Sequence, residues 1–114
     1  MATITATHDA RKGWETWTWT AITSGDTASA VDVGGNLGAI YFGGTFDSAT
    51  VVMKGSLNGS NYVAMTDPQG NALSKTAEAL EQFEERVRFM QPTHSGGSGS
   101  QSLTIVVFIA KGDR

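Results

Sequence analysis

Hydrophobic and polar residues alternate along much of the chain with the two-residue period of β-strands. The alternation is clearest in residues 14–22, where Trp17, Trp19 and Ala21 fall on one side and threonines fall on the other. Trp14 is out of phase with the other two tryptophans and falls on the threonine side. We therefore expect a strand whose Trp17 and Trp19 side chains enter a core.

Further periodic stretches predict three more strands, over residues 28–33, 37–46 and 49–57. Turn-forming residues, among them Gly34-Gly35-Asn36 and Asp47-Ser48, separate them. In the two longer strands, the apolar residues that share a face are Ile40, Phe42 and Phe46, and Val51, Met53 and Leu57.

The last predicted strand, residues 102–110, is apolar on both faces. Such a strand is either sandwiched within the fold or covered on one side by another subunit, and the sequence leaves both open. One face carries Leu103, Ile105, Val107 and Ile109, and the other carries Val106, Phe108 and Ala110.

Two turns flank a short strand over residues 62–65. Asn58-Gly59 predicts a tight two-residue hairpin, because both residues tolerate a positive φ. Residues 67–71, Asp-Pro-Gln-Gly-Asn, predict a second turn, because proline presets one dihedral angle and Gly or Asn accepts the left-handed one.

Residues 76–89 are ambiguous, because Leu80, Phe83 and Val87 have helical spacing while residues 86–89 alternate like a strand. We interpret the segment as a short helical turn near residues 77–82 followed by a strand that ends at Pro92. The Gly- and Ser-rich residues 94–101 are then expected to form a mobile loop.

These elements predict an all-β protein: a single β-sandwich or jelly-roll domain of about seven or eight short strands. Fourteen glycines and two prolines in 114 residues suit short strands joined by tight turns, and this length fits one modest core. Residues 1–13 are polar and lack a strong period, so we expect an extended N-terminal arm preceding a domain over residues 14–114.

Composition excludes several classes of function. The net charge of −3 and the scattered Lys and Arg residues argue against nucleic acid as a partner. The chain has no cysteine, which excludes disulfides and thiol chemistry. It shows neither a secretory signal nor an apolar run of about 20 residues, so we expect a soluble protein without a membrane partner.

No group of residues predicts catalysis, metal binding or a cofactor. His8 and His94 have no sequence neighbour that would orient an imidazole or share a metal ion. The Gly34-Gly35 and Gly43-Gly44 pairs neither open a helix nor carry a P-loop lysine, so turns and close strand packing explain them. We expect a protein that is not an enzyme.

Several residues are instead candidates for protein contacts, since interfaces are enriched in aromatic residues and arginine. Trp14 adjoins the arm, and the acidic segment that follows Glu78 is either a solvated face or a patch that docks on a basic surface. The candidates are Arg11, Lys12, Trp14, Glu81, Glu84, Glu85, Val106 and Phe108.

The order of turn and strand motifs over about residues 14–110 resembles small virion structural proteins of tailed bacteriophages, some of which are head cement or decoration proteins. The similarity rests on turn motifs. It is therefore specific to a protein scaffold and not to a place in the virion. The segments that carry it are Trp17 through Gly25-Asp26-Thr27, Gly44-Thr45-Phe46, Ala49-Thr50-Val51-Val52, Gly55-Ser56-Leu57-Asn58-Gly59, Thr66 to Leu73 and the closing two-sided strand.

The resemblance implies a non-enzymatic capsid cement protein that bridges and stabilises neighbouring major capsid proteins. Its implied partners are the major capsid protein and copies of itself, as a homodimer or homotrimer, and its implied location is the capsid surface of the virion after synthesis in the bacterial cytoplasm. Two alternatives stay open: a carbohydrate- or receptor-binding module of a phage fibre, and a tail or neck structural component.

Overall fold

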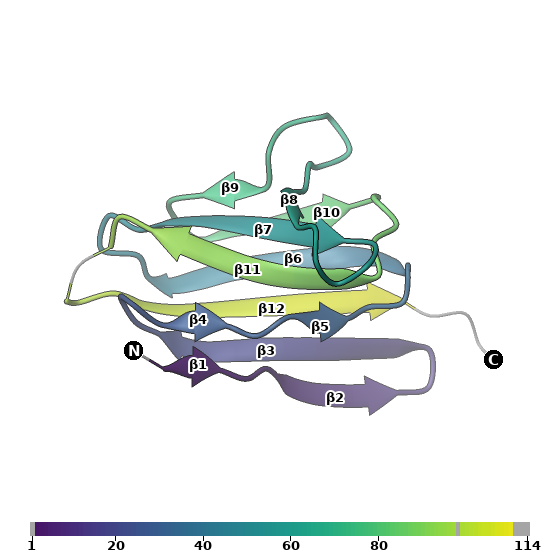
Figure 1. Ribbon diagram of the computed structural model, residues 1–114, viewed down its shortest axis with the longest axis horizontal. Helices are drawn as coiled ribbons and strands as arrows, with labels where there is room; N and C mark the ends of the chain where they lie inside the picture. The colour runs from purple at the N-terminus through teal and green to yellow at the C-terminus, as the bar shows by residue number, and fades with distance from the viewer. Residues whose placement is uncertain (1, 98, 111–114) are drawn as a thin grey trace.

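The computed structural model describes residues 2–97 and 99–110, and it confirms an all-β fold. The main strands form two sheets stacked face to face as a β-sandwich (Figure 1). In that view the strands run horizontally, and the sheet that contains β7 and β11 lies in front of the sheet that contains β12.

The first sheet has five antiparallel strands, and the two-sided strand β12 (Ser102–Ala110) lies at its centre. On one side of β12 lies β3 (Trp14–Ile22) and then β2 (Thr7–Arg11). On the other side lies β6 (Leu37–Thr45) and then β10 (Ala79–Phe83). The three central strands are therefore longer than the two edge strands.

The second sheet is built on the antiparallel pair β7 (Thr50–Ser56) and β11 (Phe89–Ser95). Three short strands extend it: β5 (Val31–Asp32) beside β11, and β8 (Val63–Ala64) and β9 (Ser74–Lys75) beside β7. A separate parallel pair joins β1 (Thr3–Ile4) to β4 (Thr27–Ala28).

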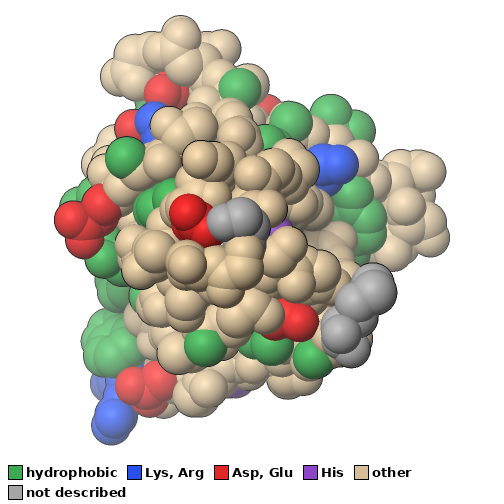
Figure 2. Space-filling model, turned by 90° about the vertical axis from the view of Figure 1, so that its left-hand side faces the viewer, with side chains coloured by type: hydrophobic (Ala, Val, Ile, Leu, Met, Phe, Trp, Pro, Cys, Tyr) green, Lys and Arg blue, Asp and Glu red, His purple; other side chains and the backbone are tan. Residues whose placement is uncertain are grey.

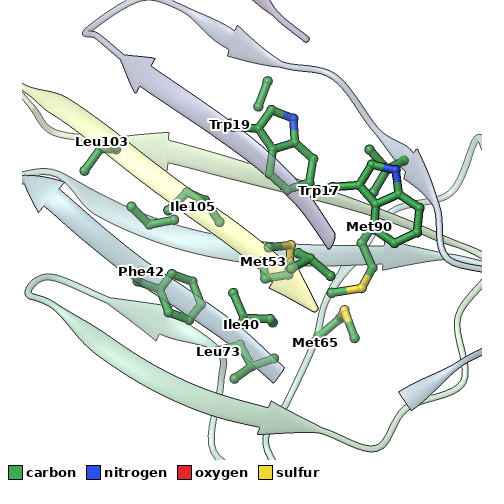
Figure 3. Packing of buried hydrophobic residues seen from close by; sticks show 14 of the residues in the cluster. Trp17, Trp19, Ile40, Phe42, Met53, Met65, Leu73, Met90, Leu103 and Ile105 are labelled. Carbon is green, nitrogen blue, oxygen red and sulfur yellow. The ribbon is translucent and has the colours of Figure 1, made fainter. Parts of the chain in front are cut away.

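The core lies between the two sheets (Figure 3). Trp17 and Trp19 are both buried, as predicted, and the indole Nε1 of Trp19 donates a hydrogen bond to the Ser29 carbonyl at 2.9 Å. The second sheet contributes sulfur-containing side chains, including Met53 and Met90, which adapt to irregular gaps.

Residues expected as an N-terminal arm are extended and hydrogen-bonded to the sandwich. Strand β2 pairs with β3 along its full length, and β1 pairs with β4. Backbone hydrogen bonds from the Thr27 N–H to the Ala2 carbonyl and from the Ser29 N–H to the Ile4 carbonyl hold residues 2–4 in place.

The predicted face of Ala21 was wrong. Between the pairs Trp19–Ile105 and Ile22–Leu103, β3 contains one residue more than β12, which makes a β-bulge. Ala21 adopts a positive φ of 58° in this bulge and is exposed, while Ile22 is buried in its place. The bulge shifts the alternation by one residue.

The predicted helical turn near residues 77–82 was also wrong, because residues 79–83 form the edge strand β10. The helical spacing of Leu80 and Phe83 arises by chance: Phe83 enters the core, whereas Leu80 is largely exposed. The following strand, β11, runs beyond Pro92 to Ser95, so His94 belongs to a strand and not to a loop.

Asn58-Gly59 does not form the tight two-residue hairpin predicted from its sequence. Pairing of Gly55 with Val63 leaves residues 56–62 as the connection. The Ser56 hydroxyl accepts a bond from the Gly59 N–H at 2.9 Å, and the Asn58 side chain accepts one from Asn61 at 3.0 Å, which shapes a wider loop. Strand β7 ends at Ser56, so Leu57 is exposed, and the prediction that it shares a face with Val51 and Met53, which are buried, was wrong.

The second predicted turn is confirmed. The Gly70 N–H bonds to the Asp67 carbonyl at 2.9 Å, and Gly70 has a φ of 90°. The Asp67 carboxylate also accepts bonds from the backbone of Gln69 and Asn71 at 3.0 and 2.9 Å. This turn aligns the flanking segments that carry the buried Met65 and Leu73.

Candidate interaction surface

The outer face of the five-stranded sheet brings together side chains that are far apart in the sequence. Strand register places Phe108 between Thr16 and Ala39, and Val106 between Thr18 and Tyr41. In the next row, Ala110 lies between Trp14 and Leu37. We call this surface the outer face; it comprises Trp14, Thr16, Thr18, Leu37, Ala39, Tyr41, Leu80, Gln82, Val106, Phe108 and Ala110.

The centre of the outer face is apolar and accessible. Phe108 is 39% exposed, and its ring stacks on Trp14 with the ring centroids 6.0 Å apart. Leu80, at the β10 edge, is 72% exposed. Hydrophobic side chains appear in profile along the left margin of Figure 2, where the outer side of this sheet lies. Apolar side chains gathered on one accessible face make this surface the candidate for interaction.

Tyr41 lies along the outer face above Gly43, since a Cβ on Gly43 would lie 2.1 Å from the tyrosine oxygen. The Tyr41 hydroxyl donates a hydrogen bond of 2.5 Å to Glu78. That bond raises the pKa of Tyr41 above its ordinary value, with smaller contributions from desolvation and from the glutamate charge. Gly43 therefore lets an aromatic ring lie flat against the sheet.

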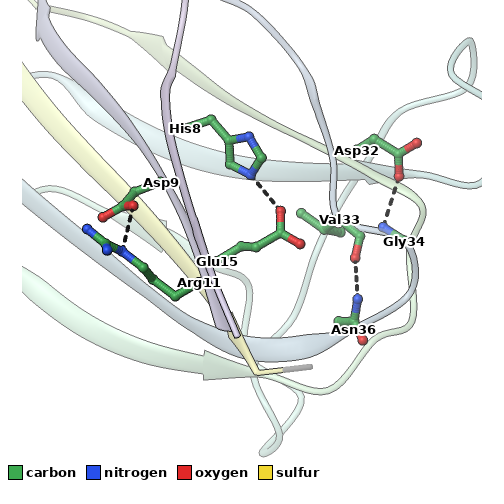
Figure 4. A network of polar contacts seen from close by, with 8 residues as sticks. All are labelled: His8, Asp9, Arg11, Glu15, Asp32, Val33, Gly34 and Asn36. Atoms are coloured by element: carbon green, nitrogen blue, oxygen red, sulfur yellow. Dashed lines mark hydrogen bonds and ion pairs between the residues drawn. The ribbon is translucent and has the colours of Figure 1, made fainter. Parts of the chain in front are cut away.

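The two lateral edges of the outer face differ in charge. Arg11 lies at the end of β2, where its Nε bonds to Asp9 at 3.0 Å (Figure 4). Glu84 follows β10 directly and lines a shallow depression of about 330 Å³ together with Leu37 and Phe108. The basic end of β2 and the acidic end of β10 thus flank the same row of the sheet.

Not all predicted contact residues lie on the outer face. Trp14, Val106 and Phe108 do, and Arg11 and Glu84 lie at its two lateral edges. Lys12 occupies the turn between β2 and β3.

The other two acidic candidates are held by contacts within the chain. Glu81 forms an ion pair with Lys75 at 2.7 Å, and Glu85 accepts a bond from the Thr66 backbone at 2.7 Å. These two glutamates stabilise the sandwich locally.

His8 has neighbours that the sequence did not reveal. Pairing of β2 with β3 sets His8 beside Trp17, and the two rings stack in parallel with centroids 4.7 Å apart. Its Nε2 lies 2.5 Å from Glu15 (Figure 4). The prediction that no neighbour orients this ring was therefore wrong, because the neighbours lie across a strand pair.

The same correction holds for His94. Its Nδ1 lies 2.9 Å from the amide nitrogen of the buried Gln101, and its Nε2 lies 2.7 Å from the Asp26 carbonyl. With Gln101 as donor to Nδ1, the proton of the neutral ring lies on Nε2 and bonds to Asp26. These contacts attach the strand end to the 23–26 turn.

A second concave surface lies at the end of the other sheet and was missed from the sequence. It has a volume of about 390 Å³ and lies between the 56–65 segment and residues 85–87. Its rim includes Leu57 and Val63, which are 72% and 69% exposed. Leu57 is exposed because β7 ends at Ser56. The sequence does not show where the strand ends, so this surface could be found only from the strand pairing.

Within residues 2–97 and 99–110, no three His, Asp or Glu side chains converge in a way that could hold a metal ion. The same residues include no helix long and apolar enough to cross a membrane.

Comparison with known proteins identifies the fold. The chain matches no protein-family model, and no curated protein matches its sequence. Among solved structures, the SPBc2 prophage-derived protein YomS is similar over 90% of this chain and 99% of its own, with a TM-score of 0.64 and 12% identity. The sandwich is therefore a fold that a prophage-derived protein also adopts.

Two other solved structures show weaker likeness. Protein NMB1881 from Neisseria meningitidis aligns over 92% of this chain and 83% of its own, with a TM-score of 0.44 and 6% identity. A chain from Bacillus endospore appendages, described as disulfide-linked pili, aligns over 94% and 89% with a TM-score of 0.42 and 16% identity.

Proposed function

We propose that this protein is a non-enzymatic structural component of a tailed-phage virion, and that it acts as a capsid cement or decoration protein. The observation that carries the proposal is an accessible apolar face on a sandwich whose fold resembles that of a prophage-derived protein over nearly its whole length. The turn motifs that resemble phage virion proteins lie within this sandwich.

Cementing a shell requires a rigid body with contact surfaces, and it requires no bond chemistry. The two stacked sheets supply the rigid body, and the outer face supplies an apolar contact surface. Repetition on a symmetric shell strengthens individually weak contacts, because copies that are linked to one another bind with a high effective concentration. The location that follows is the capsid surface, with the major capsid protein as a partner.

The test uses expanded, empty capsids and tails of the phage that encodes the protein. We expect the purified protein to bind capsids at a fixed ratio and to raise their disruption temperature, measured by calorimetry or light scattering. Heat-unfolded protein serves as the control for non-specific adsorption. Binding to tails and not to heads would overturn the cement role and establish the tail or neck alternative.

The carbohydrate-binding alternative is weaker in this fold. Trp17 and Trp19 are buried, so neither offers a platform on which a sugar ring could stack. The accessible Trp14 is stacked on Phe108 within the outer face. Specific binding to a glycan array, lost in Trp14→Ala, would favour the fibre module over the cement protein.

A further inference from the structure

The outer face has an arrangement that suits pairing with a copy of itself. Strand β12 is central, with β6 and β10 on one side and β3 and β2 on the other. The most exposed aromatic residue of the face, Phe108, lies on this central strand. If a two-fold axis ran parallel to β12 between two copies, the two strands on one side of β12 would lie over the two strands on the other side of the partner's β12.

The outer surface of the β7–β11 sheet is more mixed in polarity. Register on β7 and β11 gives its outer surface the polar side chains of Thr50, Lys54, Gln91 and Thr93, interspersed with Val52 and Phe89. Gln91 there donates a bond to the Ala28 carbonyl, so the β4 segment also contacts this surface. Among the described residues, polar side chains therefore separate the apolar ones on this surface, whereas the face over β12 carries Val106, Phe108 and Ala110 in succession along one strand.

We propose that the occupant of the outer face is a second copy of this chain, packed face to face about a two-fold axis parallel to β12. This symmetry places β12 over the partner's β12. It also places β6 over the partner's β3, and β10 over the partner's β2. Phe108 and Val106 meet the same residues of the partner, and Leu37 meets the partner's Trp14.

The charged residues at the two edges of the outer face favour this axis over a two-fold axis perpendicular to the strands. The row that contains Leu37, Ala110 and Trp14 ends in Glu84 on one side and Arg11 on the other. The proposed axis therefore sets Glu84 opposite the partner's Arg11, twice in each dimer. Aligned sheets keep their strand directions within about 30° of each other, an offset that these long side chains can span.

The alternative two-fold axis, perpendicular to the strands, brings like charges together. It would place β10 over the partner's β10, with Glu84 near the partner's Glu78. Like charges facing each other across an interface oppose association. In the proposed arrangement, by contrast, Asp9 faces the partner's Gln82, whose amide can donate a hydrogen bond.

The area of the outer face is adequate for a dimer. Three central strands of nine residues and two edge strands of five give a planar footprint of about 600 Å² at ordinary strand spacing and rise. Side-chain relief raises the accessible area above that footprint, towards the roughly 800 Å² that each partner buries in a standard interface.

The dimer specifies how the self-association that is part of the proposed function takes place, and so rests on that function. It can nevertheless be tested without capsids. A pure protein that dimerises but binds no capsid would overturn the cement role and leave the dimer standing. A monomer that stabilises capsids would do the reverse.

The decisive experiment reverses one charge at a time and then mixes the variants. We expect Arg11→Glu and Glu84→Arg each to weaken the homodimer by about 10-fold, because each puts two like-charge pairs in the interface. Mixed in equal amounts, the two variants should form a heterodimer of near wild-type affinity, since both contacts then join opposite charges. Native mass spectrometry separates the species by mass.

Arg88→Glu is the matched control, because Arg88 is equally exposed but pairs with Asp32 away from the outer face. Its homodimer should keep the wild-type affinity. A mixture that associates no better than the single variants overturns the proposal, as does a wild-type protein that is monomeric or trimeric in sedimentation.

A second test addresses which face forms the dimer. Phe108→Asp should give a monomer that keeps its far-UV circular dichroism, with a loss of affinity of more than about 100-fold, because two unpaired carboxylates would be buried together. Leu57→Asp is the control, since Leu57 is exposed elsewhere. A folded Phe108→Asp variant that still dimerises normally contradicts the proposal; if this variant unfolds, the mixing experiment decides.

Discussion

The two faces of strand β12 consist of the same kinds of residues but lie in opposite environments. Ile105 and Val107 face the second sheet and have no exposed area, whereas Val106 and Phe108 face outward and remain accessible. Hydrophobicity alone does not separate the two sets. What separates them is that the other sheet covers one face and nothing within the described chain covers the other.

The difference shows how one strand can serve two purposes. Inward residues stabilise the monomer through burial, and outward residues remain available for association. Substitutions on the two faces should therefore separate folding stability from assembly.

Truncation of the inner face should have the largest effect. Ile105→Ala removes a fully buried side chain and leaves a cavity in the core. We expect the free energy of unfolding to fall by about 3 kcal/mol. Urea denaturation followed by tryptophan fluorescence measures it, and a loss below about 1 kcal/mol would show that the core at β12 repacks easily.

The close approach of β6 to β12 gives the next test. A Cβ on Gly38 would lie 1.8 Å from the Phe108 carbonyl oxygen, so Gly38→Ala must push the two strands apart. We expect a loss of about 2 kcal/mol in unfolding free energy. Gly99→Ala is the control, because nothing lies within 4 Å of its Cβ position. Equal stability of the two variants would contradict the tight pairing.

Truncation of the outer face should cost far less in the monomer. Phe108→Ala loses partial burial and the stacking on Trp14, which we expect to lower the unfolding free energy by about 1 kcal/mol. The measurement is made at a protein concentration where sedimentation shows only monomer. A loss as large as that of Ile105→Ala would erase the distinction between the two faces.

The smallest effect concerns Tyr41 at the edge of the outer face. Its hydrogen bond to Glu78 raises its pKa, so the bond stabilises the folded protein below the ordinary value of 10.0 and is lost as pH rises through the raised pKa. Glu78→Ala should move the pKa of Tyr41 back towards 10.0. Titration of tyrosinate absorbance in a Tyr62→Phe background reports Tyr41 alone, and an unchanged pKa would rule out the bond in solution.

Sequence periodicity predicted the faces of β12 and the burial of Trp17 and Trp19, because an uninterrupted strand has a strict period of two. It failed at Ala21, where a one-residue bulge shifts the phase without any local signal. It also failed at residues 77–82, since an edge strand needs only one buried side, and Phe83 with Leu80 can imitate a helix.

The outer face could be predicted only residue by residue. Trp14 was singled out because it is out of phase, and Phe108 because its strand is apolar on both sides. Nothing in the sequence indicates that they stack, since their contact depends on the register between β3 and β12. The contacts of His8 and His94 were missed for the same reason: both are made across strands.

The short edge strands of the five-stranded sheet limit how copies can assemble. Edges with free backbone groups are templates for open-ended growth, but β2 and β10 span five residues each beside neighbours of nine, and β2 carries His8, Asp9 and Arg11. Addition of strands side by side into a filament is thereby disfavoured. The proposed association through the outer face about a two-fold axis would, by contrast, end at a closed pair, which allows a high local concentration of the protein without polymerisation.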